Sequence, residues 1–172
     1  MRRLSRASWL LLIAAASFGA VAAALVSQHV FDMQPCPWCV LQRLVFVAIG
    51  LAALLGVAWR SALGQRLLPL LLLALCGAGI AAALWQHFVA ASSVSCNLTL
   101  ADRIVAGLRL DSLLPAVFQA TATCADAAVK LAGVPYEFWS LALFAAIAAG
   151  ALRQLFSTTR YGPRPAPPAS PR

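Results

Sequence analysis

The chain has 172 residues, of which 62% are hydrophobic and only 10% charged, and its formal net charge is +8. A soluble domain is nearer half apolar and a quarter charged, so this composition excludes an ordinary soluble globular protein. The positive charge is spread over short segments between apolar runs and forms no single patch, which argues against nucleic acid as a partner. The composition therefore predicts a small integral membrane protein.

Two apolar runs open the chain. The first covers about residues 9–30 and follows three arginines, Arg2, Arg3 and Arg6. A basic start before an apolar run is also typical of a cleaved signal peptide. This run is long enough for a spanning helix of about 20 residues, so an uncleaved first span is the preferred interpretation. A second span is predicted over about residues 40–59, after a short loop at 31–39.

Two further spans are predicted over about residues 67–89 and 138–152, separated by a long loop at 90–137. The last span is the weakest by length. The segment 157–172 is rich in proline and arginine, which predicts a disordered cytoplasmic tail. The expected fold class is an all-α membrane protein, a four-transmembrane-helix bundle with a long periplasmic loop, in which residues 1–156 form a single membrane domain.

The distribution of charge predicts the orientation of these spans. One side would hold nine basic residues and no acids: Arg2, Arg3, Arg6, Arg60, Arg66, Arg153, Arg160, Arg164 and Arg172. The other side would hold Arg43, Arg103, Arg109 and Lys130 together with all five acids. The positive-inside rule then places both termini in the cytoplasm and both cysteine-bearing loops outside. In a bacterium this predicts a multi-pass protein of the inner membrane, with redox loops in the oxidising periplasm.

A short helix is predicted inside the long loop. Leu100, Ile104, Val105 and Leu108 recur at helical spacing. Thr99 with Asp102 three residues later resembles a capping box. The apolar face would continue through Leu113, Leu114, Val117 and Phe118. Such a helix can lie in the membrane interface or pack on the bundle, and the pattern leaves both alternatives open.

The segment Gln34-Pro35-Cys36-Pro37-Trp38-Cys39 places two cysteines where a polar loop becomes an apolar run. Pro37 suits the start of a helix, so Cys39 is expected in the first turn of the second span. A helix N-terminus and a nearby cation both favour a thiolate. Arg43 lies four residues after Cys39, on the same helical face. It is expected to stabilise the Cys39 thiolate and to hold a polar oxygen of a ligand; the alternative is an arginine that extends to the lipid headgroups.

A second cysteine pair, Cys96 and Cys124, lies in the long loop. These two residues can form a structural disulfide that closes the loop. They can also exchange with the first pair, which is expected on the same side of the membrane. Structural metal binding by all four cysteines is a weaker alternative, because metal ligands usually come in tight pairs. Cys76 lies in the middle of the third span and is expected to be an inert apolar core residue.

Two histidines fall near the outer ends of spans. His29 is expected to be structural. His87 should lie at the depth of Arg43 in the membrane and is a candidate ligand contact.

Together these residues resemble a known family. The Pro-Cys-x-x-Cys-x-x-x-Arg motif at residues 35–43, the Gln86-His87 pair and the long loop with Cys96 and Cys124 are similar to the bacterial disulfide bond formation protein B family, the quinone-dependent oxidases of periplasmic DsbA. The resemblance covers about residues 9–156.

The resemblance implies a relay of thiol–disulfide exchanges. Cys96 would form a mixed disulfide with a DsbA-like thioredoxin-fold partner, and Cys124 would then attack Cys36. Cys39 would pass electrons to a quinone, either ubiquinone or menaquinone, held by Arg43 and His87. The partners would thus be a periplasmic protein, membrane lipid and the quinone pool. Some relatives have an acidic residue at the position of Gln42, so a proton-handling role for that side chain is in doubt here.

Two alternatives remain at this point. One is a non-enzymatic membrane assembly or metal-handling protein with structural disulfides. The other is a quinone-coupled thiol oxidase of the vitamin K epoxide reductase type, in which the Cys-x-x-Cys motif lies late in the chain rather than at the second span.

Overall fold

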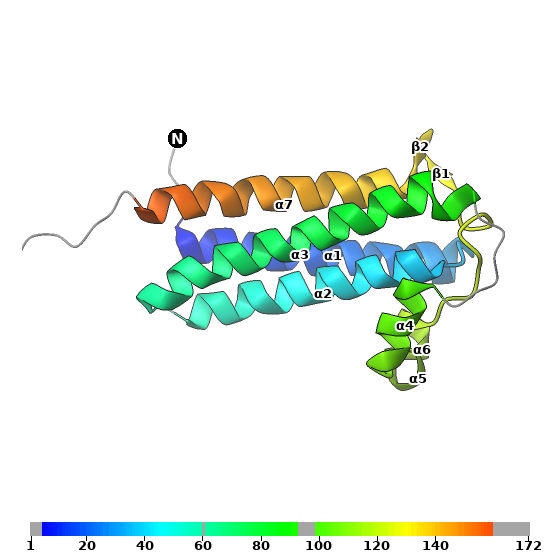
Figure 1. Ribbon diagram of the computed structural model, residues 1–172, viewed down its shortest axis with the longest axis horizontal. Helices are drawn as coiled ribbons and strands as arrows, with labels where there is room; N and C mark the ends of the chain where they lie inside the picture. The colour runs from blue at the N-terminus through cyan, green and yellow to red at the C-terminus, as the bar shows by residue number, and fades with distance from the viewer. Residues whose placement is uncertain (1–4, 60, 93–98, 160–172) are drawn as a thin grey trace, which may run out of the picture.

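Four long helices form the body of the protein. They are α1 (Arg6–Val30), α2 (Pro37–Ala58), α3 (Ala62–Phe88) and α7 (Tyr136–Thr159). The structure is a computed structural model and describes residues 5–59, 61–92 and 99–159. Figure 1 shows the four helices side by side, with the start of α1 and the end of α7 at the same end of the bundle. All four are long and apolar enough to cross a membrane, so the fold is an all-α, multi-pass membrane bundle.

The helices start where short polar residues can cap them. The Ser5 side chain accepts from the Ser8 N–H at the start of α1, and the Ser61 side chain accepts from the Gly64 N–H at the start of α3. The cap at Ser61 explains why α3 begins at Ala62, earlier than the predicted span at 67. At the other end of the chain α7 runs through Thr159, so the predicted disorder is wrong for residues 157–159. The remainder of the predicted tail lies outside the described residues.

One apolar core joins all four helices. Leu10 from α1, Ile49 from α2, Leu72 from α3 and Phe144 from α7 are each at most 1% exposed. Large apolar side chains on the outer faces remain exposed, among them Leu12, Leu55, Leu71 and Phe156. Exposed side chains of this kind are expected where a bundle faces lipid. Cys76 belongs to the core and is fully buried, as expected of an inert residue.

Glycine allows α3 and α7 to approach closely in this core. A Cβ at Gly79 would lie 2.5 Å from Cζ of Phe144, whose ring stacks on Phe46 at a centroid distance of 4.0 Å. Gly77 lies on the same helix, and a Cβ there would meet nothing within 4 Å. Position 79 therefore has no space for a side chain, whereas position 77 has.

Gly79→Ala should destabilise the bundle because overpacking costs about 1–3 kcal/mol, which exceeds the gain of about 1 kcal/mol in helix propensity. Gly77→Ala is the matched control and should be neutral or slightly stabilising. Thermal unfolding in detergent, followed by circular dichroism, would compare the two. An equal or higher Tm for Gly79→Ala than for Gly77→Ala would contradict the expected clash.

In its described residues, the loop between α3 and α7 contains three short α-helices, α4 (Leu100–Gly107), α5 (Leu110–Leu113) and α6 (Pro115–Phe118). The capping box of Thr99 and Asp102 is confirmed at the start of α4. The predicted continuous apolar face is wrong, because Arg109 adopts a left-handed backbone and Pro115 restricts Leu114. These two residues divide the segment into separate turns.

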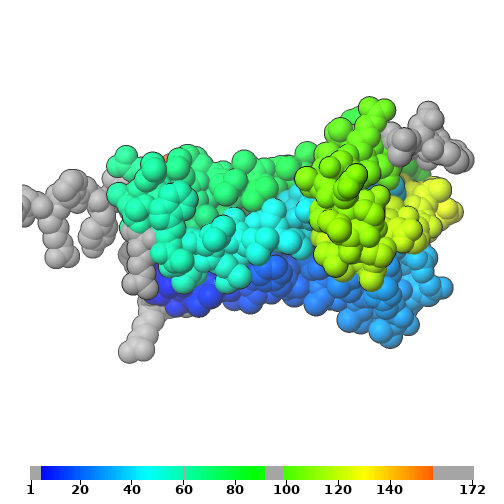
Figure 2. All heavy atoms as spheres, turned by 90° about the horizontal axis from the view of Figure 1, so that it is seen from below, coloured from blue at the N-terminus to red at the C-terminus, as the bar shows by residue number. Residues whose placement is uncertain are grey.

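The loop helices pack on one end of the bundle. Figure 2 shows them over α1 and α2, and α4 and α6 both contact α2. Ala101 and Val105 of α4 and Phe118 of α6 are at most 5% exposed, whereas Leu108 and Leu113 are more than half exposed. Of the two predicted alternatives, packing on the bundle is therefore observed for the inner face of the loop helices. Their outer face carries exposed apolar side chains. A position in the membrane interface remains a prediction.

A one-turn 3-10 helix, Ala90–Ser92, follows α3, and a small hairpin precedes α7. Strands β1 (Lys130–Leu131) and β2 (Val134–Pro135) pair antiparallel. The two residues between them, Ala132 and Gly133, both have positive φ, as the tight turn of a two-residue hairpin requires. The Tyr136 N–H then donates to the Val129 carbonyl, which fixes the start of α7 close to the predicted position.

Candidate thiol–disulfide site

Three cysteine sulfurs meet at the start of α2. Cys36 is the N-cap of this helix, and its Sγ accepts from the Cys39 N–H at 3.3 Å. The Sγ atoms of Cys36 and Cys39 are 2.7 Å apart, and both residues are free thiols. Cys124 from the long loop packs in the same buried cluster and forms a hydrogen bond with Cys36. Cys36 is thus the central sulfur, flanked by Cys39 on one side and Cys124 on the other.

Backbone hydrogen bonds bring the loop to this position. The N–H groups of Thr121 and Ala122 both donate to the Pro35 carbonyl, at 3.0 and 3.2 Å. The Thr121 hydroxyl donates to Oε1 of Gln34 at 2.7 Å. The segment just before Cys36 therefore holds the segment just before Cys124. Sequence spacing alone does not predict this contact, because the residues are far apart in the chain.

The contact between Cys36 and Cys124 shifts the pKa values of the two thiols in opposite directions. The hydrogen bond with Cys124 raises the pKa of Cys36, and contact with Cys39 and burial raise it further. The same hydrogen bond from Cys36 lowers the pKa of Cys124, with a smaller contribution from the Trp38 backbone. Since the thiolate is the nucleophile in disulfide exchange, Cys124 is the better attacking group and Cys36 the thiol that it faces.

Cys36→Ala should make Cys124 less reactive near neutral pH. Without the hydrogen bond, the pKa of Cys124 rises, so a higher pH is needed for the same thiolate fraction. The expected effect is an upward shift of roughly one pH unit in the midpoint of alkylation against pH. Iodoacetamide labelling of the Cys124 peptide in reduced protein, read by mass spectrometry, measures it, with Cys76→Ala as the control. A midpoint that stays in place or moves down would contradict the arrangement.

Arg43 is buried, with 6% of its surface exposed. Its Nη1 donates to Oε1 of Gln28 at 2.6 Å and to the Val117 carbonyl at 3.0 Å, and its Nη2 donates to the Ala24 carbonyl at 3.4 Å. These contacts join α2 to α1 and to α6, so the interpretation of Arg43 as a side chain that extends to lipid headgroups is wrong. All three acceptors are neutral oxygens. A buried cation without a carboxylate among these partners is costly, which favours a functional role.

A partly open cavity lies beside Cys39 and Arg43. It has a volume of about 750 Å³, and its polar lining includes Cys39, Arg43, Gln42, Gln86 and Glu137. Ala20, Ala24, Phe46 and Leu143 contribute apolar walls. A largely apolar cavity of this size with a few convergent polar groups is typical of a small-molecule site. The cavity places the predicted pair, Cys39 and Arg43, in one site.

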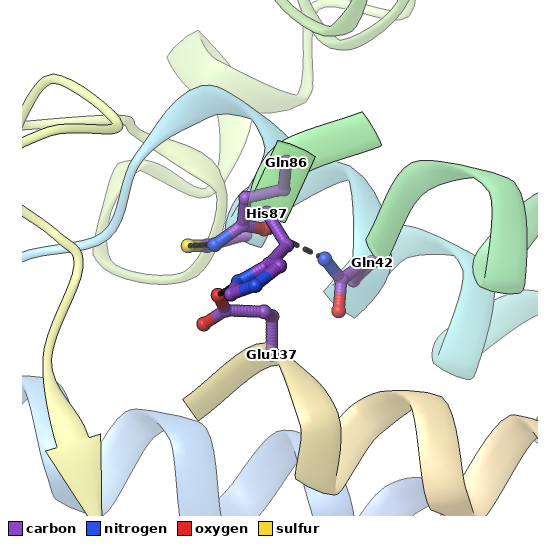
Figure 3. A network of polar contacts seen from close by, with 5 residues as sticks. Gln42, Gln86, His87 and Glu137 are labelled. Atoms are coloured by element: carbon purple, nitrogen blue, oxygen red, sulfur yellow. Dashed lines mark hydrogen bonds and ion pairs between the residues drawn. The ribbon is translucent and has the colours of Figure 1, made fainter. Parts of the chain in front are cut away.

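His87 lies beside this cavity rather than in its lining within the described part of the chain. Its Nδ1 is 2.6 Å from Oε1 of Glu137, and its ring packs against Phe88 and Phe138. Figure 3 shows the imidazole of His87 facing the carboxylate of Glu137. Glu137, only 6% exposed, does line the cavity. The structure therefore links the predicted residue to the site through Glu137, which the sequence did not single out. A direct ligand contact by His87 remains a prediction.

Two amide side chains complete the site. Nε2 of Gln42 donates to Oε1 of Gln86, and Nε2 of Gln86 donates to Sγ of Cys39. One feature of the sequence could have identified Gln42 and Gln86 as site residues, because polar side chains are rare in spanning helices. The remaining predicted site residue, Cys96, lies outside the described residues. Within the part of the chain that the structure describes, no three His, Cys, Asp or Glu side chains come together as metal ligands.

A membrane bundle with a dithiol at the start of one helix and a loop cysteine against it defines a membrane thiol–disulfide protein. The sequence model of the family "Disulfide bond formation protein DsbB" matches residues 5–154. The chain therefore belongs to this family.

Individual relatives agree with that assignment. The disulfide bond formation protein B of Ralstonia nicotianae is 39% identical over 149 residues, covering 82% of this chain and 87% of the relative. The protein of the same name from Herminiimonas arsenicoxydans is 35% identical over 147 residues, covering 84% and 91%. That of Cupriavidus necator is 36% identical over 143 residues, covering 82% and 86%.

Proposed function

We propose that this protein is a thiol:quinone oxidoreductase that reoxidises a periplasmic DsbA-like dithiol protein. The observation that carries the proposal is the row of three sulfurs, Cys124, Cys36 and Cys39, that ends at a cavity containing Arg43. Electrons can enter this row at the aqueous loop and leave it at an apolar site. Family membership supports the same activity in its coarser form, disulfide bond formation.

The first part of the reaction takes place in the loop. The loop starts with a Cys96–Cys124 disulfide. A thiolate of the reduced partner attacks Cys96, the bond between Cys96 and Cys124 breaks, a mixed disulfide forms at Cys96, and Cys124 leaves as a thiolate. The Cys124 thiolate then attacks Cys36 of a Cys36–Cys39 disulfide. The bond between Cys124 and Cys36 forms, the bond between Cys36 and Cys39 breaks, and Cys39 keeps the electron pair. The packing of Cys124 against Cys36 in one buried cluster supports this choice of attacked sulfur.

The partner's second thiol then displaces Cys96 from the mixed disulfide, so the partner leaves oxidised. The freed Cys96 thiolate attacks Cys124, which re-forms the Cys96–Cys124 disulfide and releases Cys36, and the Cys36–Cys39 dithiol is then ready to give up two electrons and two protons as its own disulfide re-forms.

The second part takes place in the cavity. The thiolate of Cys39 is held there by the N–H of Gln86, and the positive charge of Arg43 lies one helical turn away. The cavity volume, the apolar walls and the buried cation fit a quinone ring with its carbonyl oxygens. When bound, a quinone would supply an acceptor for two electrons and two protons. Arg43 would hold one of its oxygens, and Glu137, which pairs with His87, is a titratable group in the lining of the same cavity.

Energetics require such an acceptor. DsbA is a strong oxidant, with a potential of about −120 mV, so an ordinary structural disulfide cannot oxidise it. A quinone pool would serve as the acceptor for the two electrons of the Cys36–Cys39 dithiol, and the exchange would then run forward without a strained disulfide.

The proposed location is the bacterial inner membrane, with both termini in the cytoplasm and the cysteine loops in the periplasm. The arrangement of charge supports it. In the predicted topology the side of the termini carries nine of the thirteen basic residues of the sequence, whereas the loop side carries four, Arg43, Arg103, Arg109 and Lys130.

Purified protein tests the function directly. Reduced DsbA should be oxidised only when quinone is added, and extraction of freshly purified protein should yield bound quinone. Ubiquinone and menaquinone, supplied separately, would show which one supports turnover. Cys76→Ala should behave as wild type. Protein that carries no quinone and leaves DsbA reduced with either quinone would point instead to a non-enzymatic membrane protein with structural disulfides.

A further inference from the structure

A chain of two buried amides ends on the sulfur that faces the cavity. Gln42 on α2 and Gln86 on α3 are each 4% exposed. Nε2 of Gln42 donates to Oε1 of Gln86 at 2.7 Å, and Nε2 of Gln86 donates to Sγ of Cys39 at 3.3 Å. Figure 3 shows the two amides pointing toward each other between their helices. The contacts cross from α2 to α3 and back to α2.

The direction of the Gln86 amide matters for the charge on sulfur. A thiolate accepts hydrogen bonds and cannot donate one, so it is stabilised only if Gln86 presents nitrogen. If the amide were reversed, its oxygen would face the sulfur and its nitrogen would face the nitrogen of Gln42. With Gln42 presenting its nitrogen, as in the structure, the hydrogen bond to the Gln86 oxygen favours the orientation that a Cys39 thiolate needs.

Arg43 does not supply this contact. Its hydrogen bonds in the described part of the chain go to Gln28, Val117 and Ala24, so its charge acts on Cys39 across a distance. Gln86 is the group from the neighbouring helix that touches the sulfur. The two effects are separate, and a neutral donor adds no charge to the apolar site.

We propose that Gln86 is a catalytic hydrogen-bond donor to the Cys39 thiolate, and that Gln42 is a positioning residue that keeps the Gln86 amide in the donating orientation. The role in turnover rests on the proposed function. The donation itself is a property of the reduced protein and is measurable without quinone.

Neutral replacements isolate the amides from other charges. The titratable or charged groups around Cys39 come from its own helix end, from both loops and from α7; they are Cys36, Arg43, Asp32, Cys124, Asp126, Tyr136 and Glu137. Gln86→Leu, Gln42→Leu and the double variant leave all of them in place. Gln65→Leu, at the opposite end of α3, is the matched control.

The experiment measures alkylation of Cys39 against pH in reduced, quinone-free protein, with the Cys39 peptide read by mass spectrometry. Gln86→Leu should move the midpoint upward by about one pH unit, because a hydrogen bond to a charged group is lost. Gln42→Leu should give a smaller upward shift. The double variant should match Gln86→Leu alone, since Gln42 acts only through Gln86. Gln65→Leu should leave the midpoint in place.

An unchanged midpoint in Gln86→Leu would overturn the donor role, and shifts that add fully in the double variant would overturn the positioning role. Gln86→Met, unbranched and also without a donor, replaces Gln86→Leu if the latter does not fold. The alkylation result does not depend on the proposed function. If the wild-type protein does not oxidise DsbA with added quinone, the proposed function is wrong, but the measured midpoints still decide whether Gln86 donates to Cys39.

Discussion

Cys36→Ser and Cys39→Ser should both stop DsbA oxidation, but at different steps. In Cys39→Ser, Cys36 still contacts Cys124, so a Cys36–Cys124 disulfide should accumulate. In Cys36→Ser this disulfide cannot form, and the loop cysteines should be trapped reduced while Cys39 still faces Gln86 and the cavity. Turnover in both variants should fall to the uncatalysed background.

Peptide mapping under non-reducing conditions distinguishes the two trapped species. Cys76→Ala serves as the control because that thiol lies in the core, away from the three-sulfur row. Identical disulfide patterns in the two serine variants would contradict the division of roles between Cys36 and Cys39. Near-normal turnover in Cys39→Ser would contradict the electron path itself.

Arg43→Gln should lower kcat/KM for DsbA oxidation by about 10²-fold or more, the usual effect of removing a group that stabilises charge in a buried site. The substitution removes the positive charge beside Cys39 and also the bonds that join α2 to α1 and α6. Steady-state kinetics with varied quinone would show the effect in kcat as well as in KM.

Gln28→Leu separates the effect of the Arg43 charge from the effect of the hydrogen bond that joins Arg43 to α1. It removes the 2.6 Å contact with Arg43 but keeps the cation, so the loss should be about tenfold or less, in line with one hydrogen bond to a charged group. If Arg43→Gln stays within twofold of wild type, or if Gln28→Leu is as severe as Arg43→Gln, the charge is not the reason for burying this arginine.

Local features of the site could be predicted from the sequence. Pro37 and the Cys36 cap define the start of α2, and this places Cys39 and Arg43 one turn apart. The capping box of Thr99 and Asp102 could also be predicted from the sequence, because it depends on two residues that are three positions apart. Spans were recognisable because an apolar run of about 20 residues has few alternatives to a membrane helix.

Contacts between helices could not be predicted in this way. A helix that is apolar all around does not show which face turns inward, so nothing in the sequence paired Gln42 with Gln86 or His87 with Glu137. The break between α5 and α6 was missed for a related reason, since helical spacing continues across Pro115 while the backbone does not.

For this chain, then, the sequence by itself determined the membrane class, the four spans, the dithiol at a helix start and the arginine one turn beyond it. Only the tertiary structure decided that Cys124 lies against Cys36 rather than elsewhere in the loop, that Arg43 is enclosed, and that the Gln86 amide reaches Cys39. The physical reason is that hydrogen bonds along one helix follow from its period, whereas contacts across helices depend on their rotation and on where the loop is held.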